Sequence, residues 1–268
     1  LVTVITPHNT HAELGLKCLK AGRHVVMEKP FAITTAECDR MIAEARKRGR
    51  VLSVYHNRHW DRGIMQAVKT SQAGAIGDGD RVEAHMGQWK QPANWWRSSR
   101  TLSGGILYDW GVHLLEYTFQ IIDSEMTEVA AFDTSGYWAQ KVSWAGDTNE
   151  DEACMVIRYA DGRWSTLTIT NLDSNPKPRQ MEITGTKGSY LFDNKTYTLI
   201  QQKAGKVVRT DGANPPNQYV RYYRNIADHL TRKTELVIPP EYARRPAHAL
   251  DLARRSIKAG KAMAVKYR

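Results

Sequence analysis

The first 60 residues alternate short apolar runs with amphipathic segments, and this alternation limits the possible folds more than any other feature of the sequence. The segments at residues 11–21 and 34–48 carry apolar side chains at helical spacing, and each is followed by a glycine suited to a helix C-terminus. Short apolar strands separated by helices are typical of a parallel sheet. We therefore predict three parallel strands, at residues 1–5, 24–28 and 51–55.

After residue 61 the pattern changes to strands of period two that follow one another through tight turns. Turns at residues 160–162 and 186–188 contain glycine and join neighbouring strands as hairpins, which predicts an antiparallel sheet. We expect strands at residues 78–90, 127–143, 151–160, 162–172, 180–185, 188–193 and 195–200. Helices are expected at residues 61–74, 110–122, 219–232 and 241–260, and a loop at residues 211–217.

These patterns predict an α/β unit followed by an α+β domain with a large, mainly antiparallel, open-faced sheet. We assign residues 1–60 to the first unit, residues 61–240 to the α+β domain, and residues 241–268 to a C-terminal helix and tail. Three strands are few for a doubly wound sheet, in which each strand–helix–strand unit takes about 30 residues or more. We therefore expect further strands upstream of Leu1, and no leader-like segment precedes the first strand.

The net charge of +10 results from 38 Lys and Arg against 28 Asp and Glu. These cations are spread from Lys17 to Arg268, so we interpret them as solvated helix faces and predict no nucleic-acid partner. No apolar run approaches the roughly 20 residues that a membrane helix needs, and no membrane association is expected. The cysteines Cys18, Cys38 and Cys154 are widely spaced, as is typical of reduced thiols in a cytoplasmic protein. No spacing of His and Cys predicts a metal site.

Three segments together resemble the signatures of the Gfo/Idh/MocA oxidoreductase family. They are residues 6–11 (TPHNTH) with 28–30 (EKP), residues 104–113 (GGILYDWGVH), and residues 54–61 (VYHNRHWD), the last similar to the form seen in scyllo-inositol dehydrogenases. The resemblance implies that residues 1–60 are the C-terminal remnant of a dinucleotide-binding Rossmann domain. It also implies NAD or NADP as cofactor, with an incomplete binding site, because the sequence contains no G-x-G-x-x-G turn to approach the pyrophosphate.

The resemblance assigns the chemistry to Lys29, Asp109 and His113. Asp109 and His113 are four residues apart, so on a helix they would share one face, where the carboxylate would raise the basicity of the imidazole. His113 is then expected to take the hydroxyl proton as hydride leaves. Lys29 follows the second strand, where such sheets bind ligands, and is expected to stabilise charge on the substrate oxygen. Without the resemblance, the Asp–His pair could equally be a helix-stabilising contact, and Lys29 part of a solvated turn.

Further residues are expected around this trio. By the resemblance, the nicotinamide half of the cofactor contacts the first strand end and its helix, together with the second and third strand ends. The cofactor-binding residues are Thr6, Pro7, His8, Asn9, His11, Glu28, Lys29 and Asn57. The substrate is expected to contact Lys29, Asn57, Arg58, Trp96, Asp109, Trp110 and His113, because tryptophan faces pack on sugar C–H surfaces and cations orient hydroxyls.

The predicted function is NAD(P)-dependent hydride transfer from or to a secondary alcohol of a sugar, inositol or sugar derivative. Two alternatives stay open: a dinucleotide-binding regulatory protein without turnover, and a glycosidase that oxidises and re-reduces its sugar with retained NAD. The resemblance also implies a homodimer or homotetramer formed through the antiparallel sheet, whose open face would otherwise leave apolar side chains exposed.

Overall fold

The N-terminal part of the chain folds as a small parallel sheet in the computed structural model, which describes residues 1–144 and 146–266. Strands β1 (Val2–Val4), β2 (Val25–Met27) and β3 (Leu52–Val54) lie side by side in that order, connected by α1 (His11–Lys20) and α2 (Thr35–Arg48). Thr34 caps α2 in a capping box with Glu37, and Gly49 ends the helix in the left-handed conformation. The predicted parallel unit is confirmed.

A nine-stranded sheet dominates the rest of the described chain, with the order β11-β10-β9-β8-β4-β7-β6-β5-β12. Neighbouring strands run antiparallel, except that β4 and β7 are parallel in its centre. The strands are β4 (Gly79–Gly87), β5 (Met126–Thr134), β6 (Glu152–Tyr159), β7 (Trp164–Thr170), β8 (Met181–Gly185), β9 (Gly188–Phe192), β10 (Thr196–Lys203), β11 (Lys206–Ala213) and β12 (Met263–Ala264). The predicted large, mainly antiparallel sheet is therefore confirmed.

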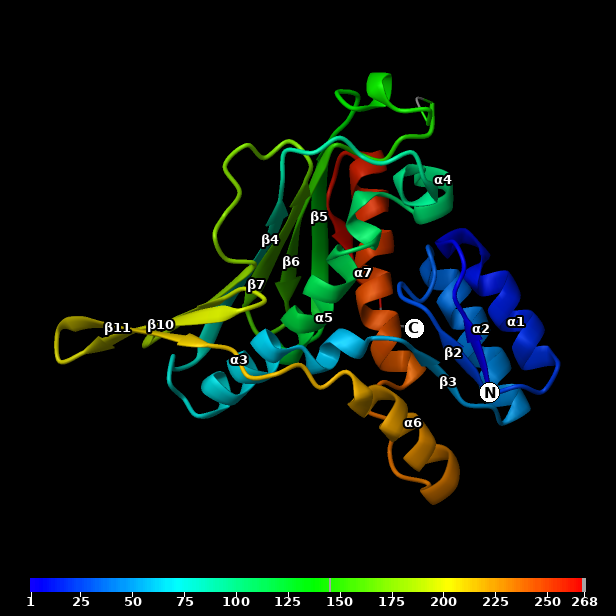
Figure 1. Cartoon of the computed structure of the whole chain (residues 1–268), viewed down its shortest axis with the longest axis horizontal. Helices are drawn as coiled ribbons and strands as arrows, with labels where there is room; N and C mark the ends of the chain where they lie inside the picture. Colours follow the sequence, from blue (N-terminus) through cyan, green and yellow to red (C-terminus); the bar gives the residue numbers. More distant parts are fainter. Residues whose placement is uncertain (145, 267–268) are drawn as a thin grey trace.

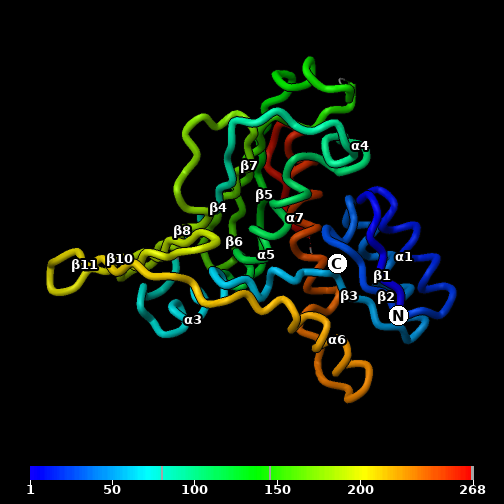
Figure 2. Tube along the Cα trace, viewed as in Figure 1, coloured from blue at the N-terminus to red at the C-terminus, as the bar shows by residue number. Residues whose placement is uncertain are grey.

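Helices cover one face of this sheet and connect it to the N-terminal unit. Helix α5 (Gly111–Ile121) packs on β4 and β7, α7 (Pro240–Ala259) packs on β5, and α3 (Arg62–Gln72) packs on β9. Helix α7 also contacts β3 and α2, so it lies between the two sheets (Figure 1). The chain returns to the N-terminal unit through α6 (Val220–Arg232), whose buried Tyr222 and Ile226 pack into the core of that unit (Figure 2).

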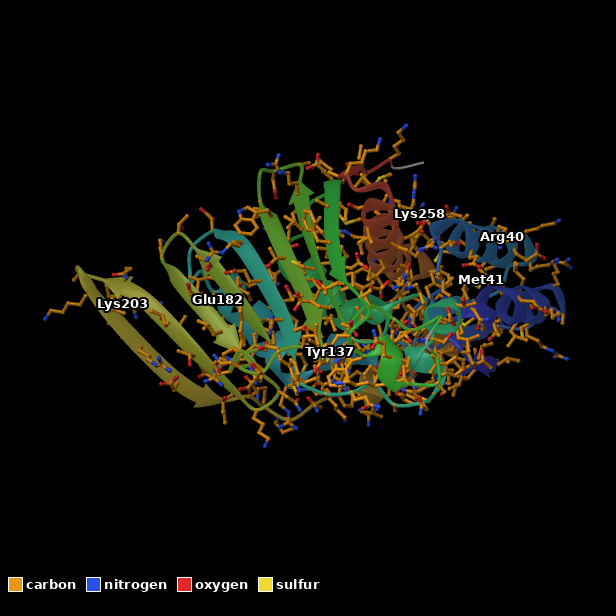
Figure 3. The ribbon with its side chains drawn as sticks, turned by 90° about the horizontal axis from the view of Figure 1, so that it is seen from above. Arg40, Met41, Tyr137, Glu182, Lys203 and Lys258 are labelled. Carbon is orange, nitrogen blue, oxygen red and sulfur yellow. The ribbon has the colours of Figure 1, made fainter. Side chains whose placement is uncertain are left out.

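Two predicted segments differ from the structure. The strand expected at residues 127–143 ends at Thr134, because the Asp151 carboxylate accepts the amides of Tyr137 and Trp138 and draws the chain out of the sheet. The loop expected at 211–217 begins later, because residues 206–213 pair with β10 as a strand. This β10–β11 hairpin carries Lys203 at the end of the molecule opposite Arg40 of α2 (Figure 3). The predicted domain boundaries stay predictions.

None of the helices in the described residues is long and apolar enough to cross a membrane.

Candidate active site

An ion pair between the two parts of the chain forms the centre of the candidate site. Lys29 follows β2, and its Nζ lies 2.6 Å from Asp109 Oδ1 and 2.9 Å from the Asp109 carbonyl oxygen. Arg97 Nε lies 3.3 Å from the same carboxylate oxygen. Burial alone would raise the pKa of Asp109, but the charge and hydrogen bond of Lys29, and then Arg97, hold it below its ordinary value. Asp109 is therefore an ionised carboxylate that fixes the Lys29 ammonium.

A glycine turn places Asp109 in this position. Gly104 and Gly105 have φ values of +94° and +122°, which L side chains rarely adopt. After the turn, the Ile106 amide donates to Glu150 Oε2 at 2.8 Å, and Ile106 opens the short 3₁₀ turn η4 (Ile106–Tyr108) just ahead of Asp109. The paired glycines thus set the direction in which the chain delivers the carboxylate to Lys29.

His113 lies in the first turn of α5 and is almost completely buried. Burial, and then the charges of Lys29, His56 and Arg58, lower its pKa well below the ordinary value. The Lys29 ammonium thus acts on the imidazole through its charge, while the ion pair joins Lys29 to Asp109 directly. The ring packs edge-on against Trp110, with centroids 5.6 Å apart.

The predicted contact between Asp109 and His113 is wrong. The hydrogen bonds of the described residues join the Asp109 carboxylate to Lys29 and Arg97, and His113 Nδ1 has no partner. The physical reason is that Asp109 precedes α5, which begins at Gly111, so the four-residue spacing does not put both side chains on one helix face. The basicity of His113 is consequently lowered rather than raised.

Two histidines of the first strand end are structural. His11 is fully buried and its ring nitrogens lie 2.9 Å from the Pro30 carbonyl oxygen and 3.0 Å from that of Thr6, so it joins two strand-end loops. His8 is 2% exposed; its Nδ1 lies 2.7 Å from the Ser103 carbonyl oxygen, and burial lowers its pKa to about 3. Both rings lie beneath the surface, and the expectation that His8 and His11 line the cofactor stays a prediction.

The other strand-end residues leave a polar surface at this edge. Thr6 accepts a hydrogen bond from Thr10 Oγ1 at 2.7 Å, Asn9 is exposed, and the Glu28 carboxylate accepts the Lys29 amide at 2.6 Å. Helix α1 continues directly from the 3₁₀ turn η1 (His8–Thr10), and the Pro7 and His8 carbonyl oxygens accept the Thr10 and His11 amides. The Thr6 hydroxyl and the exposed Asn9 amide are thus the polar groups at this edge that would suit the ribose of a dinucleotide.

The residues expected to contact substrate divide into two groups. Asp109 and Trp110 line a cavity of about 360 Å³ beside β4 and β7. Its wall also includes Trp95, Arg97 and Lys90, whereas the expected Trp96 packs against His8 with ring centroids 4.8 Å apart. Trp95, with 47% of its surface exposed, joins Trp110 in this wall, and Trp96 is not among the lining residues.

Arg58 and Asn57 lie on the 3₁₀ turn η2 (Asn57–Trp60), beside a smaller cavity of about 70 Å³ that Arg58 and Trp110 line. The Arg58 guanidinium lies 4.5 Å from the Trp110 ring centroid and pairs with Asp61 at 2.8 Å. The sequence analysis did not predict the ion pair between Arg58 and Asp61, although an acidic residue three positions after an arginine has the spacing that such a pair needs. Arg58 therefore holds Trp110 in place at the mouth of both cavities.

The metal-ligating side chains that the structure describes do not gather into a group of three or more that could hold a metal ion.

Comparison with known proteins gives a consistent result for both parts of the chain. Residues 1–56 match the model of an oxidoreductase family with an NAD-binding Rossmann fold (GFO_IDH_MocA), and residues 64–191 match the C-terminal domain model of the same family. Myo-inositol 2-dehydrogenase of Thermotoga maritima is 30% identical over 74% of this chain and 58% of that enzyme. The NADP⁺-dependent scyllo-inositol 2-dehydrogenase IolW of Bacillus subtilis is 34% identical over 45% of this chain and 34% of that enzyme.

Among solved structures, a levoglucosan dehydrogenase in complex with NADH superposes with a TM-score of 0.84, over 99% of this chain and 79% of that chain. At 19% identity this likeness speaks for the fold alone. In their alignments, the chain spans 58% of the length of the myo-inositol dehydrogenase and 34% of the length of the scyllo-inositol dehydrogenase.

Proposed function

Because the chain belongs to the Gfo/Idh/MocA family of NAD(P)-dependent oxidoreductases, we propose that it transfers hydride between NAD(P) and a secondary alcohol of a sugar, an inositol or a related derivative. The observation that carries this proposal is the 2.6 Å contact between Lys29 and Asp109, made across the two parts of the chain, with Asp109 also lining the cavity beside β4 and β7. It sets a fixed cation where an alcohol oxygen would be deprotonated.

Lys29 and His113 divide the proton chemistry in this proposal. The Lys29 ammonium, held by Asp109, stabilises negative charge developing on the substrate oxygen. His113 accepts the hydroxyl proton, for which it must be neutral, and burial together with the Lys29 charge keeps it so at neutral pH by lowering its pKa. Thr6 and Asn9 would hold the ribose of a nicotinamide cofactor, which would supply the hydride acceptor for the same carbon.

The cavity wall suits a polyhydroxylated substrate. Trp95 and Trp110 present aromatic faces for C–H surfaces, while Lys90 and Arg97 donate hydrogen bonds to hydroxyls. Arg97 also stacks over Trp95, with its guanidinium carbon 4.7 Å from the ring centroid, so the two side chains form one rigid wall. The inositol dehydrogenases among the relatives point to the same substrate class.

A spectrophotometric assay tests the proposal. The purified protein is incubated with NAD⁺ or NADP⁺ and with myo-inositol, scyllo-inositol or levoglucosan, and reduced nicotinamide is followed at its absorbance band. We expect reduction with at least one pair and its loss in Lys29→Met. Binding of NAD without reduction across the set would favour a regulatory protein. Consumption of a glycoside without net NADH would favour the redox-cycling glycosidase.

We also propose that the open face of the large sheet forms a homo-oligomer. On this face Phe132, Cys154 and Thr168 lie in one register row across β5, β6 and β7, opposite the buried residues of the same strands. Phe132 is 68% exposed in the single chain and lies on β5, close to the edge of the sheet. A second copy packed face to face would bury it.

A further inference from the structure

A buried polar network extends along α5, away from the substrate cavity, and the proposed hydride transfer does not use it. Glu116 follows His113 by one helical turn, and only 1% of its surface is exposed. Its Oε1 lies 2.6 Å from His59 Nδ1 and accepts the Tyr242 hydroxyl at 2.6 Å. Burial raises the pKa of Glu116, but the hydrogen bond and charge of His59 outweigh this and leave the pKa below its ordinary value. An anionic carboxylate is thus held inside the protein.

A second histidine lies between His113 and this carboxylate. The turn η2 packs against α5. His59 lies on this turn and His56 directly precedes it, and the three-residue spacing between them equals the spacing of His113 and Glu116 on the helix. His59 contacts Glu116. Three residues towards the N-terminus lead from His59 to His56 and from Glu116 to His113, so His56 is brought towards His113. The electrostatics agree: after burial, the charge of Glu116 has the largest effect on the pKa of His56, and the charge of His56 lowers the pKa of His113.

The ring nitrogens in this region are unusual. His56 is fully buried, and neither its Nδ1 nor its Nε2 has a hydrogen-bond partner; Nδ1 of His113 has none either. Leaving a buried polar group unpaired is costly, so three such atoms on two neighbouring elements are unexpected for a region that serves packing alone. An imidazole that passes a proton on must accept at one nitrogen and release from the other, and His56 has both nitrogens free to do so.

The far end of the network reaches the surface. His59 keeps 20% of its side chain exposed and lines, with Gln120 and Tyr242, a cavity of about 610 Å³. Asp109 and Trp110 line the substrate cavity at the other end of α5. From His113 to Gln120 the helix rises about 10 Å, at 1.5 Å per residue. The network thus opens at its His59 end to one cavity, while Asp109 and Trp110, just ahead of α5, line the other.

We propose that His56 and the Glu116–His59 pair form a path that conducts the proton released at His113 to the cavity lined by His59, Gln120 and Tyr242. The inference rests on the proposed function. In alcohol oxidation the O–H bond breaks and its proton moves to His113, while the C–H bond breaks and its electron pair leaves as hydride to NAD⁺, giving a ketone, NADH and one proton. His113 passes this proton to His56, His56 passes it to the Glu116–His59 pair, and His59 releases it to water. In the reductive direction the same groups deliver it.

Stopped-flow measurement of one turnover tests the path, with NADH absorbance and a pH-indicator dye followed together in weak buffer. We expect the two signals to coincide in the native protein. In His56→Gln and Glu116→Gln, NADH formation should stay within about threefold of native, since His113 still takes the first proton, while proton release lags at least tenfold. Added imidazole should restore steady-state turnover in His56→Gln.

His248→Gln is the matched control, because His248 is another buried histidine with an unpartnered Nε2 but lies on α7, outside the path. It should behave as native. Proton release that keeps pace with NADH in both path variants, or an equal fall of both signals, overturns the proposal. Absence of NADH in the native protein rejects the proposed function instead, and the proton path with it.

Discussion

Replacing Gly105 by alanine should destabilise the protein through two separable effects. Gly105 has φ +122°, so any side chain there is strained, at a cost of about 1–3 kcal/mol. The added Cβ would also lie 2.8 Å from Glu150 Oε2, which is closer than such atoms approach in proteins. Glu150 cannot move freely, because the same oxygen accepts the Ile106 amide at 2.8 Å and the other carboxylate oxygen faces Arg100 at 3.3 Å.

The magnitude follows from what Glu150 must give up. If its carboxylate retreats, the buried Ile106 amide loses its acceptor, which costs about 1–3 kcal/mol. Strain and lost hydrogen bond together predict a decrease of about 4 kcal/mol in the free energy of unfolding. Gly136 provides a matched control: its φ is +109°, but a Cβ there would meet no atom within 4 Å. Gly136→Ala should show the strain alone, about 2 kcal/mol.

Urea unfolding followed by tryptophan fluorescence measures both variants against the native protein. The prediction is that Gly105→Ala is less stable than Gly136→Ala by about 2 kcal/mol, the difference reporting the displaced carboxylate. Equal losses in the two variants would show that Glu150 relaxes without cost, and would refute the claim that its contacts fix the turn that delivers Asp109.

Three further predictions concern the site and the assembly. Lys29→Met should lower turnover at least about 100-fold in the NADH assay, because the negative charge on the substrate oxygen is no longer stabilised by a cation. Lys17→Met is the control and should leave turnover unchanged, since it breaks an exposed ion pair with Glu13 that has the same N–O distance, 2.6 Å. Burial lowers the pKa of His56 from 6.5 to about 4, so the free energy of unfolding is unaffected by His56 above pH 6.5 and decreases as the pH falls towards 4. In urea titrations over that window, the free energy of unfolding of His56→Leu should change with pH less steeply than that of the native protein, by about 1.4 kcal/mol per pH unit. An unchanged slope would contradict the burial. Phe132→Lys should convert an oligomer into monomers in light scattering, and a monomeric native protein would dismiss the open-face interface.

The regular parts of the fold could be predicted because their periodicity is strong. The strands β6 and β7 alternate buried and exposed residues, and the capping box of Thr34 and Glu37 marks the start of α2. The strand β11 carries no such signal, since its residues are almost all exposed and it is defined by pairing with β10. Likewise, the end of β5 depends on the Asp151 carboxylate, 14 residues from the Tyr137 amide that it accepts.

The site could be predicted only in part, for the same reason. Lys29 and Asp109 are separated by 80 residues, so the residues alone give no reason to pair them, and the family resemblance identified them. The resemblance gave no geometry, and the local i,i+4 rule then paired Asp109 with His113 instead of with the distant Lys29. Glu116 and Tyr242 were missed because burial, rather than any motif, distinguishes them, and His56 lies within the quoted segment 54–61 but only its burial sets it apart there.

The low pKa of His113 links the site to the interior behind it. A buried imidazole beside the Lys29 ammonium is available as a base because it is neutral, but for the same reason it cannot retain the proton that it accepts. The Lys29–Asp109 pair offers no second acceptor, since the Asp109 carboxylate is held by two cations that lower its pKa. Of the groups whose charges act on this interior, Glu116 is the anion that raises the pKa of the neighbouring His56. In the proposed path, these charges favour movement of the proton inwards along α5 over its return towards the substrate.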